Sequence, residues 1–170
     1  MKQIKTLLIA ATLFFAATSL TNAQSKVAHI NTGELIQLMP EMIAANGDLQ
    51  KIAETVQADI QAMQLEIKKK SEQYNAESQS KTDEENEKRF YEVEGNKKDM
   101  RDYAVNADNE LKDKRMKLYE PIFKQAKAAI LKVGKAQGFD YVLDSTEGGG
   151  LLMADGKNLL EDVKKELGIK

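Results

Sequence analysis

Few residues in this 170-residue chain could carry out covalent chemistry. There is one histidine, His29, and no cysteine. A zinc site would have to combine His29 with carboxylates alone, whereas protein zinc sites draw mainly on several nitrogen or sulfur ligands. No G-x-S-x-G motif supplies a serine nucleophile. We therefore predict that His29 is a packed or edge residue on a strand, and that the chain has no catalytic residue and no metal site.

Residues 150–158 (GLLMADGKN) resemble a phosphate-binding loop only superficially. That motif needs four residues before its Gly-Lys pair, followed by a serine or threonine hydroxyl for Mg²⁺. Here five residues separate Gly150 from Gly156, and Asn158 follows Lys157. The sequence therefore predicts no nucleotide and no other cofactor.

Acidic residues crowd positions 83–87, namely Asp83, Glu84, Glu85 and Glu87. They could bind a cation, but the helix dipole favours acids at the start of any helix. Carboxylate pairs that hydrolyse substrates also need a shaped pocket, which two thin helices do not supply. We interpret this cluster as a solvated helix start.

The elements that hold these residues are predicted to be mostly helical. Residues 41–137 contain only three glycines and one proline, and such a stretch without turn residues indicates helix. Apolar residues recur there at steps of three and four along two runs. The first run comprises Leu49, Ile52, Val56, Ile60, Met63, Ile67 and Tyr74; the second comprises Phe90, Val93, Met100, Ala104, Ala107, Leu111, Leu118 and Ile122, with Lys97 and Lys114 on the same stripe. This narrow seam is typical of a coiled coil, since a globular helix shows a wider apolar face.

A polar break near residues 78–83 separates the two runs. Thr82 followed by Glu85 forms the pattern of a capping box at a new helix. We predict that residues 41–137 form an antiparallel helical hairpin, with arms of about 60 Å at 1.5 Å per residue.

Residues 24–40 and 138–170 are predicted to form a small β-rich body. The expected elements are a strand over 26–31, a helix capped by Asn31 that ends before Pro40, a strand over 139–145, a turn over 147–150, a returning strand over 151–154 and a helix over 158–167. This body is near the lower size limit for a core without disulfides or metal. It also leaves sheet edges open. The predicted fold class is therefore α+β, mostly α, with a small β body built by oligomerisation.

The first 23 residues have the layout of a secretory signal peptide. Lys2 and Lys5 precede an apolar run over 7–20, and residues 21–23 then present small residues at the two positions that a signal peptidase reads. A membrane anchor is the alternative, but the run of about 14 residues is shorter than the roughly 20 that span a bilayer. We expect secretion and a mature chain that begins at Gln24.

Charge excludes one class of partner. The chain holds 25 basic and 27 acidic residues, whereas proteins that bind nucleic acid cluster Lys and Arg on one face. No nucleic-acid partner is expected.

The chain resembles the Skp/OmpH family in four of its parts. These are the strand KVAHIN (26–31), the charged hairpin, the segment KAAILKVGKAQGFDYVLD (127–144) and the closing helix. The resemblance covers essentially the whole mature chain. It implies an ATP-independent periplasmic holdase that binds unfolded outer-membrane β-barrel proteins. It also implies a homotrimer in which short strands build a barrel-like body and three hairpins enclose a cavity.

Two sets of residues follow as candidates from that resemblance. Sparse apolar side chains on the arms would contact unfolded proteins: Met63, Met100, Tyr103 and Met116. Apolar residues of the short strands would build the oligomerisation body: Val27, Ile30, Tyr141, Leu143 and Leu151. The alternative for Met63 and Met100 is that they fill the seam of the hairpin.

The chain departs from the family in its charge. Well-known members carry basic arm tips, whereas this tip is acid-rich, so the sequence does not favour contact with lipopolysaccharide or anionic membranes. The main alternative function is a structural coiled-coil protein of the envelope that tethers a single partner. The sequence leaves the identity of any bound protein open.

Overall fold

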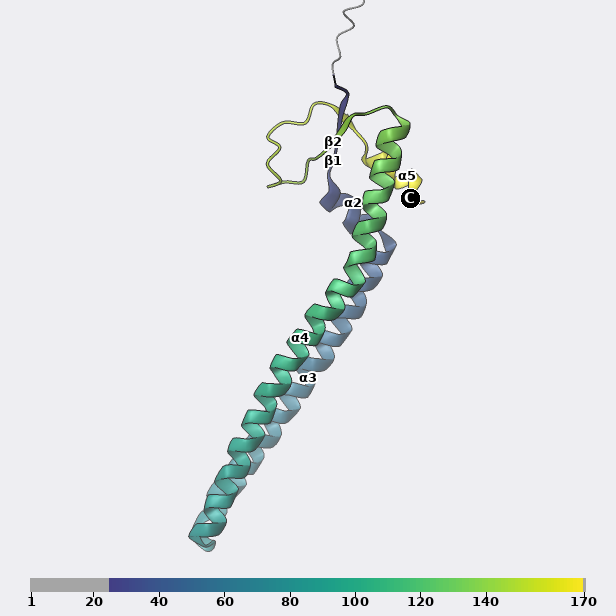
Figure 1. Ribbon diagram of the computed structural model, residues 1–170. Coiled ribbons are helices and arrows are strands. Elements are labelled where there is room, and N and C mark those ends of the chain that lie inside the picture. Colours follow the sequence, from purple (N-terminus) through teal and green to yellow (C-terminus); the bar gives the residue numbers. More distant parts are fainter. Residues whose placement is uncertain (1–24, 170) are drawn as a thin grey trace, which may run out of the picture.

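The structure, a computed structural model, describes residues 25–169; the predicted signal peptide, residues 1–23, lies outside the described residues. The chain forms a long helical hairpin with a small body at one end (Figure 1). Two helices build the hairpin, α3 over Pro40–Glu77 and α4 over Asp83–Ala136. The predicted fold class, α+β and mostly α with an antiparallel hairpin, is confirmed.

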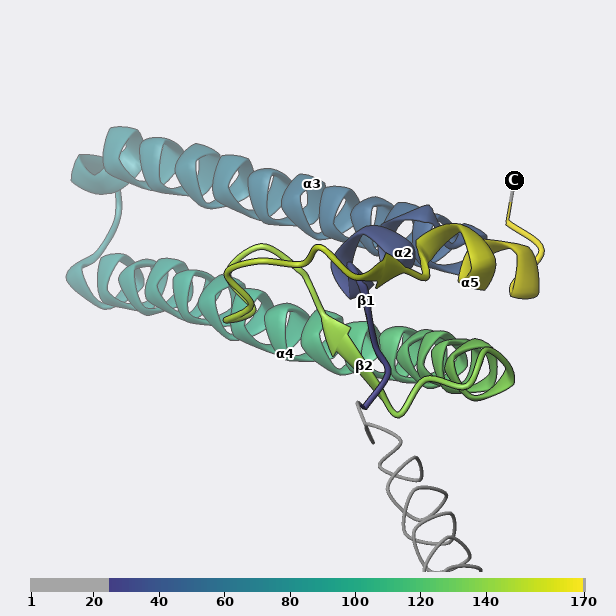
Figure 2. The same ribbon diagram turned by 90° about the horizontal axis from the view of Figure 1, so that it is seen from above.

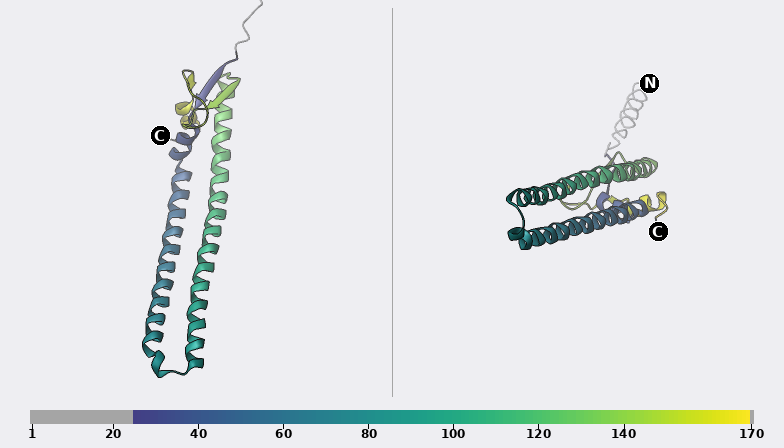
Figure 3. Two further views of the ribbon diagram at one scale, coloured as in Figure 1. Left: turned by 90° about the vertical axis from the view of Figure 1, so that its left-hand side faces the viewer. Right: turned by 90° about the horizontal axis from the view of Figure 1, so that it is seen from below.

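The hairpin turns within a few residues at its far end. A single 3-10 turn, η1, covers Ser78–Ser80, and α4 then begins after its N-cap Thr82. The Thr82 hydroxyl accepts a hydrogen bond from the Glu85 amide at 3.2 Å, as the capping pattern predicts. The Asn86 side chain donates to the Ser78 carbonyl at 2.9 Å, which ties the start of α4 to the turn. Both views in Figure 3 show α3 and α4 side by side along the arm.

The seam between α3 and α4 is narrow. Most of its residues are half-buried, and outside the body only Leu49, Val93 and Ala107 are fully buried among the described residues. The expectation that Phe90 lies in this seam is wrong, because the residue is 60% exposed. Arg89 takes the place, with its guanidinium stacked on the Tyr74 ring at 4.7 Å.

The body contains a three-stranded parallel sheet. Its strands are β1 (Val27–Ile30), β2 (Tyr141–Asp144) and β3 (Lys157–Asn158), in the order β2-β1-β3. The body lies at one end of the hairpin (Figure 1), and the view from above shows β2 over α4, which it contacts (Figure 2). The register places Val27 opposite Tyr141 and Ala28 opposite Lys157.

The returning strand predicted over residues 151–154 is wrong, because those residues form no strand. The reason is the direction of β3, which pairs parallel to β1. A parallel partner requires the chain to travel back along the sheet before it pairs. Residues 145–156 make that passage as a loop, and the third place in the sheet goes to Lys157–Asn158.

The core lies between the sheet and the helices. Asn31 caps α2 (Thr32–Leu38) by accepting from the Glu34 amide at 2.9 Å, and α5 (Leu160–Glu166) contacts α4. Thirteen buried residues form one cluster: Ala28, Ile30, Leu35, Met39, Met42, Ala45, Ile122, Ala126, Ala129, Val133, Leu159, Leu160 and Val163. None of the helices within residues 25–169 is long and apolar enough to cross a membrane.

Candidate functional site

The carboxyl ends of β1 and β2 are joined by a polar latch around Asp144. Its carboxylate accepts hydrogen bonds from the amides and the hydroxyls of both Thr32 and Thr146, at 2.6–3.2 Å. Burial alone would raise the pKa of this carboxyl, but the four hydrogen bonds outweigh it and lower the pKa from 3.8 to about 2. The latch therefore fixes the start of α2 against the end of β2.

His29 lies on β1 and is half-buried. Its Nδ1 is 3.0 Å from the Ser145 hydroxyl, so the ring packs as a strand residue beside the latch. Within residues 25–169 no group of three or more His, Cys, Asp or Glu side chains could hold a metal ion.

In the part of the chain that the structure describes, one face of the sheet is uncovered. Because side chains alternate along a strand, Ala28 and Ile30 point into the core while Val27 points outward. Tyr141, opposite Val27, and Leu143 are also exposed. Of the residues predicted to build an oligomerisation body, these three share one open surface. Ile30 lies in the core of its own chain, and Leu151 is half-buried on the loop.

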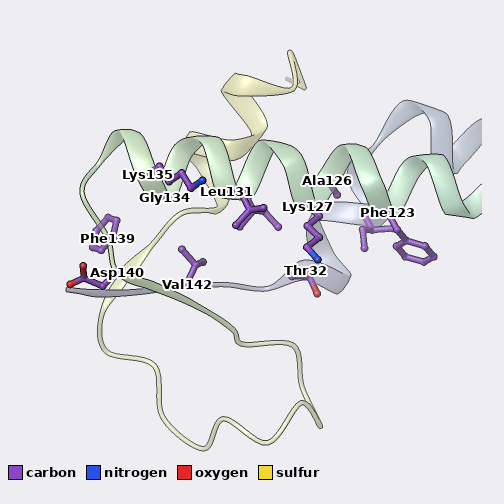
Figure 4. Close-up of a pocket in the computed structure, with 12 residues that line it drawn as sticks. Thr32, Phe123, Ala126, Lys127, Leu131, Gly134, Lys135, Phe139, Asp140 and Val142 are labelled. Carbon is purple, nitrogen blue, oxygen red and sulfur yellow. The ribbon is translucent and has the colours of Figure 1, made fainter. Parts of the chain in front are cut away.

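An apolar groove lies on the other side of the strands, against α4 (Figure 4). Its volume is about 490 Å³. Phe123, Leu131 and Lys127 of α4 line one wall, and Phe139 and Val142 line the wall formed by the start of β2. We call this cavity the α4–β2 groove. It combines apolar walls with two flanking lysines, Lys127 and Lys135 (both among its lining residues).

The four arm residues predicted to contact unfolded proteins have different environments. Met63 and Met100 are half-buried at seam positions. Tyr103 spans the seam, where its hydroxyl donates to an Asp59 carboxylate oxygen at 2.7 Å, and this bond raises the pKa of the tyrosine. Met116 alone is openly available, at 63% exposure. The structure therefore does not bring the four together.

Met116 belongs to a set of exposed apolar side chains on α4 whose other members, Tyr91, Val105 and Phe123, escaped the sequence analysis. Tyr91, Val105, Met116 and Phe123 are separated by steps of 14, 11 and 7 residues, which place them on one face of a helix. We call them the α4 stripe. Phe123 also lines the α4–β2 groove, so the stripe leads from the arm to the body. The sequence does contain a signal for them, because these apolar residues are out of phase with the spacing of the seam.

Charged residues lie around the α4 stripe, and near the arm tip some of them link α3 to α4. The Glu92 carboxylate accepts from the Lys70 ammonium and the Tyr74 hydroxyl, both at 2.8 Å. These two hydrogen bonds lower the pKa of Glu92. Arg89 donates to Glu77 at 2.9 Å, and its Nη1 atom is buried without a hydrogen-bond partner among the described residues. The tip is thus held by polar contacts rather than by an apolar core.

These features define a protein with a thin arm, whose side chains are mostly exposed, on an α+β body with a packed core. Comparison with known proteins identifies a family with this architecture. The sequence profile described as outer membrane protein (OmpH-like) matches residues 26–167. A search among curated proteins gave no match.

Among solved structures, one described as a candidate outer membrane chaperone (OmpH-like) from Caulobacter crescentus CB15 is similar over 85% of each chain. Its TM-score is 0.72 at 14% sequence identity, so this similarity concerns the fold. Because the family profile spans nearly all of the described residues, the chain belongs to the OmpH-like family.

Proposed function

We propose that this protein is an ATP-independent holdase chaperone of the periplasm that binds unfolded outer-membrane β-barrel proteins. The observation that carries the proposal is the α4 stripe. It aligns exposed apolar side chains on one face of an arm whose surface is largely charged. Membership in the OmpH-like family supports the same function.

The proposed mechanism is capture by many weak contacts. Strands of an outer-membrane barrel alternate apolar and polar residues, and an unfolded strand exposes both kinds. Tyr91, Val105 and Met116 would bind the apolar residues, while the balanced charges between them keep the arm soluble. Methionine suits such varied contacts because it is flexible and polarizable. Several weak contacts together give a useful affinity, and binding the unfolded state holds it without fuel.

Met63, Met100 and Tyr103 contribute less in this proposal than the sequence suggested. The first two already fill the seam, and the tyrosine hydroxyl is engaged by Asp59. Met116 remains a proposed contact.

The proposal includes a homotrimer built through the body, residues 24–40 and 138–170. The open sheet face of Val27, Tyr141 and Leu143 supports it, because an exposed apolar face invites coverage by another surface. The arms, residues 41–137, would then project together around a shared space. Secretion through the predicted signal peptide would deliver the chain to the periplasm.

No lipopolysaccharide partner is proposed. Asp83, Glu84 and Glu85 stand in the first turn of α4 at the arm tip, where acidic side chains repel anionic membrane surfaces.

Native mass spectrometry of the chain from Gln24 onward tests the proposal, alone and with a β-barrel protein diluted from urea. We expect a trimer that takes up one unfolded barrel protein. A monomer or dimer that leaves the barrel protein unbound would contradict the proposal.

A charged variant of the stripe sharpens this experiment. Val105→Asp with Met116→Asp should reduce uptake, because each substitution replaces an exposed apolar contact with a charge. Gln57→Asp with Gln61→Asp adds the same charge at exposed positions of α3 and should leave uptake unchanged. Equal uptake by both variants would exclude the stripe as the binding surface.

The alternative function is a structural coiled-coil protein that tethers one folded partner. It predicts tight binding to a single envelope protein and no protection of unfolded ones. The α4 stripe favours the chaperone, because its apolar residues lie 7 to 14 residues apart and form no continuous patch for one folded surface.

A further inference from the structure

The α4–β2 groove and the loop over residues 145–156 are complementary features on opposite sides of the same sheet. The groove is an apolar hollow of about 490 Å³, within the roughly 300–1,000 Å³ that is usual for ligand pockets. The loop carries two apolar side chains that no residue within 25–169 covers. Leu152 is fully exposed and Met153 is 72% exposed.

The position of the loop keeps it out of the groove of its own chain. Figures 1 and 4 both show β1 and β2 lying between the loop and α4. The two ends of the loop are fixed: the Ser145 amide donates to the Ile30 carbonyl at 2.9 Å, and Lys157 pairs with Ala28. To enter the groove of its own chain, the loop would have to pass around the free edge of β2.

The charges at the two surfaces also match. Glu147 and Asp155 flank the apolar residues of the loop, and both are exposed. Lys127 and Lys135 flank the groove. Asp140 is the acid among the lining residues, and one of its carboxylate oxygens already accepts from the Lys26 amide at 2.8 Å. An acid–apolar–acid segment is therefore complementary in charge to a groove rimmed by lysines.

We propose that Leu152 and Met153 of one copy of this chain insert into the α4–β2 groove of a second copy. Because the inserted side chains and the groove are different surfaces, the contact is heterologous, and its repetition builds the ring of the proposed trimer when three rotations close the circle. The inference rests on the proposed assembly and identifies the contact that orders its subunits. Gly148 and Gly150, both at positive φ, give the loop the turns from which the two side chains project.

Cysteine cross-linking tests the contact directly, because the chain has no cysteine of its own. Met153→Cys is placed in one subunit and Leu131→Cys in a second subunit that carries an affinity tag. The two are co-expressed and oxidised. We expect a disulfide-linked pair of one tagged and one untagged subunit on a denaturing gel. Val105→Cys replaces Leu131→Cys in the control, which should give no such pair.

Two further measurements distinguish a failure of the proposed contact from a failure of the proposed assembly. A chain with both Met153→Cys and Leu131→Cys that closes only an internal disulfide would overturn the proposal, because the loop would then cover its own groove. Native mass spectrometry of the same samples reports assembly independently. A trimer without the cross-link overturns this contact and leaves the proposed function standing, whereas a monomer overturns both.

A variant that removes the apolar side chains of the loop tests the same contact without thiol chemistry. Leu152→Asp with Met153→Asp should weaken assembly at least tenfold without unfolding the subunit, because both side chains lie outside its core. Circular dichroism checks the fold, and mass as a function of dilution measures assembly. Unchanged assembly would contradict the proposal.

Discussion

The body and the arm of this molecule are stabilised in different ways. Of the sixteen buried apolar residues in the described chain, thirteen form the cluster in and beside the body. The arm beyond it buries only Leu49, Val93 and Ala107, and its tip relies on ion pairs such as Arg89 with Glu77. A long hairpin of this kind has little interior, so most of its side chains remain available at the surface.

This difference explains how one short chain can combine a fixed shape with an adaptable surface. The body packs its core from the thirteen-residue cluster, whereas α4 leaves Tyr91, Val105 and Met116 exposed. Substitutions of the same kind in the two regions should therefore have different effects on stability.

The largest contrast is expected from shortening one apolar side chain in each region. Leu35 is fully buried in the body cluster, so Leu35→Ala should lower the free energy of unfolding by about 2–5 kcal/mol. Met63 is half-buried in the seam, and Met63→Ala should cost only about 1 kcal/mol. Urea unfolding of both variants at one protein concentration measures the difference; equal losses would show that the arm is packed like the body.

A smaller effect is expected at the latch of the body. Asp144→Ala removes the acceptor of four hydrogen bonds and should cost about 1 kcal/mol at pH 7, given the screening of an exposed carboxylate. The pKa of Asp144 is lowered from 3.8 to about 2 in the folded chain. Its contribution is therefore complete above pH 3.8 and is lost as the pH falls through about 2.

Urea unfolding at pH 7, 4 and 2 checks this prediction. The stabilities of the wild type and of Asp144→Ala should converge at the lowest pH. A difference that stays constant over this range would show that the hydrogen bonds do not depend on the charged carboxylate.

Replacing a glycine by alanine should have opposite effects on the free energy of unfolding in the two regions. At Gly134 in the body, an added Cβ would lie 2.9 Å from Val142 Cγ2, so Gly134→Ala should lower the free energy of unfolding by about 1 kcal/mol or more. At Gly95 in the arm nothing lies within 4 Å of that position, and Gly95→Ala should raise it by about 1 kcal/mol. Thermal unfolding measures both; a stabilising Gly134→Ala would contradict the close contact between α4 and β2.

The smallest effect is expected at the arm tip. Arg89→Ala removes the stacking on Tyr74 and the ion pair with Glu77, which should increase opening of the tip by several-fold with little change in global stability. Hydrogen exchange of the amides near residues 74–92 measures it. Lys88→Ala, an exposed neighbour, is the control; equal exchange in both variants would show that Arg89 does not hold the tip.

Periodicity predicted the arm well because the seam repeats over many turns. The cap at Thr82 was also predictable, since its partner Glu85 is only three residues away. Phe90 was assigned to the seam on its apolar side chain. Only the structure shows Arg89 stacked there on Tyr74, a residue of the other helix.

The body was predicted less completely because its contacts are distant in sequence. Residues 151–154 have an apolar pattern that fits a strand, yet β3 forms at Lys157–Asn158 through pairing with Ala28 and His29. The groove could not be predicted either, because α4, α2 and β2 form it together. The α4 stripe was visible in the sequence as apolar residues out of phase with the seam.

The central claim is that the arms hold the unfolded protein while the body assembles the subunits. The most direct test of this claim is to shorten the arms symmetrically. Tyr103 bonds to Asp59, and Glu92 accepts from both Lys70 and Tyr74. Averaged over these pairs, residues 60–73 lie opposite residues 91–104, so the two segments can be removed together. The deletion takes two heptads from each helix and keeps the seam in phase. It shortens the arm by about 21 Å.

Light scattering of a barrel protein diluted from urea, at equal chaperone concentration, is the measurement. Protection against aggregation should fall at least twofold, while native mass shows the same assembly as the full chain. Undiminished protection by the shortened protein would contradict the claim that the arms hold the unfolded protein.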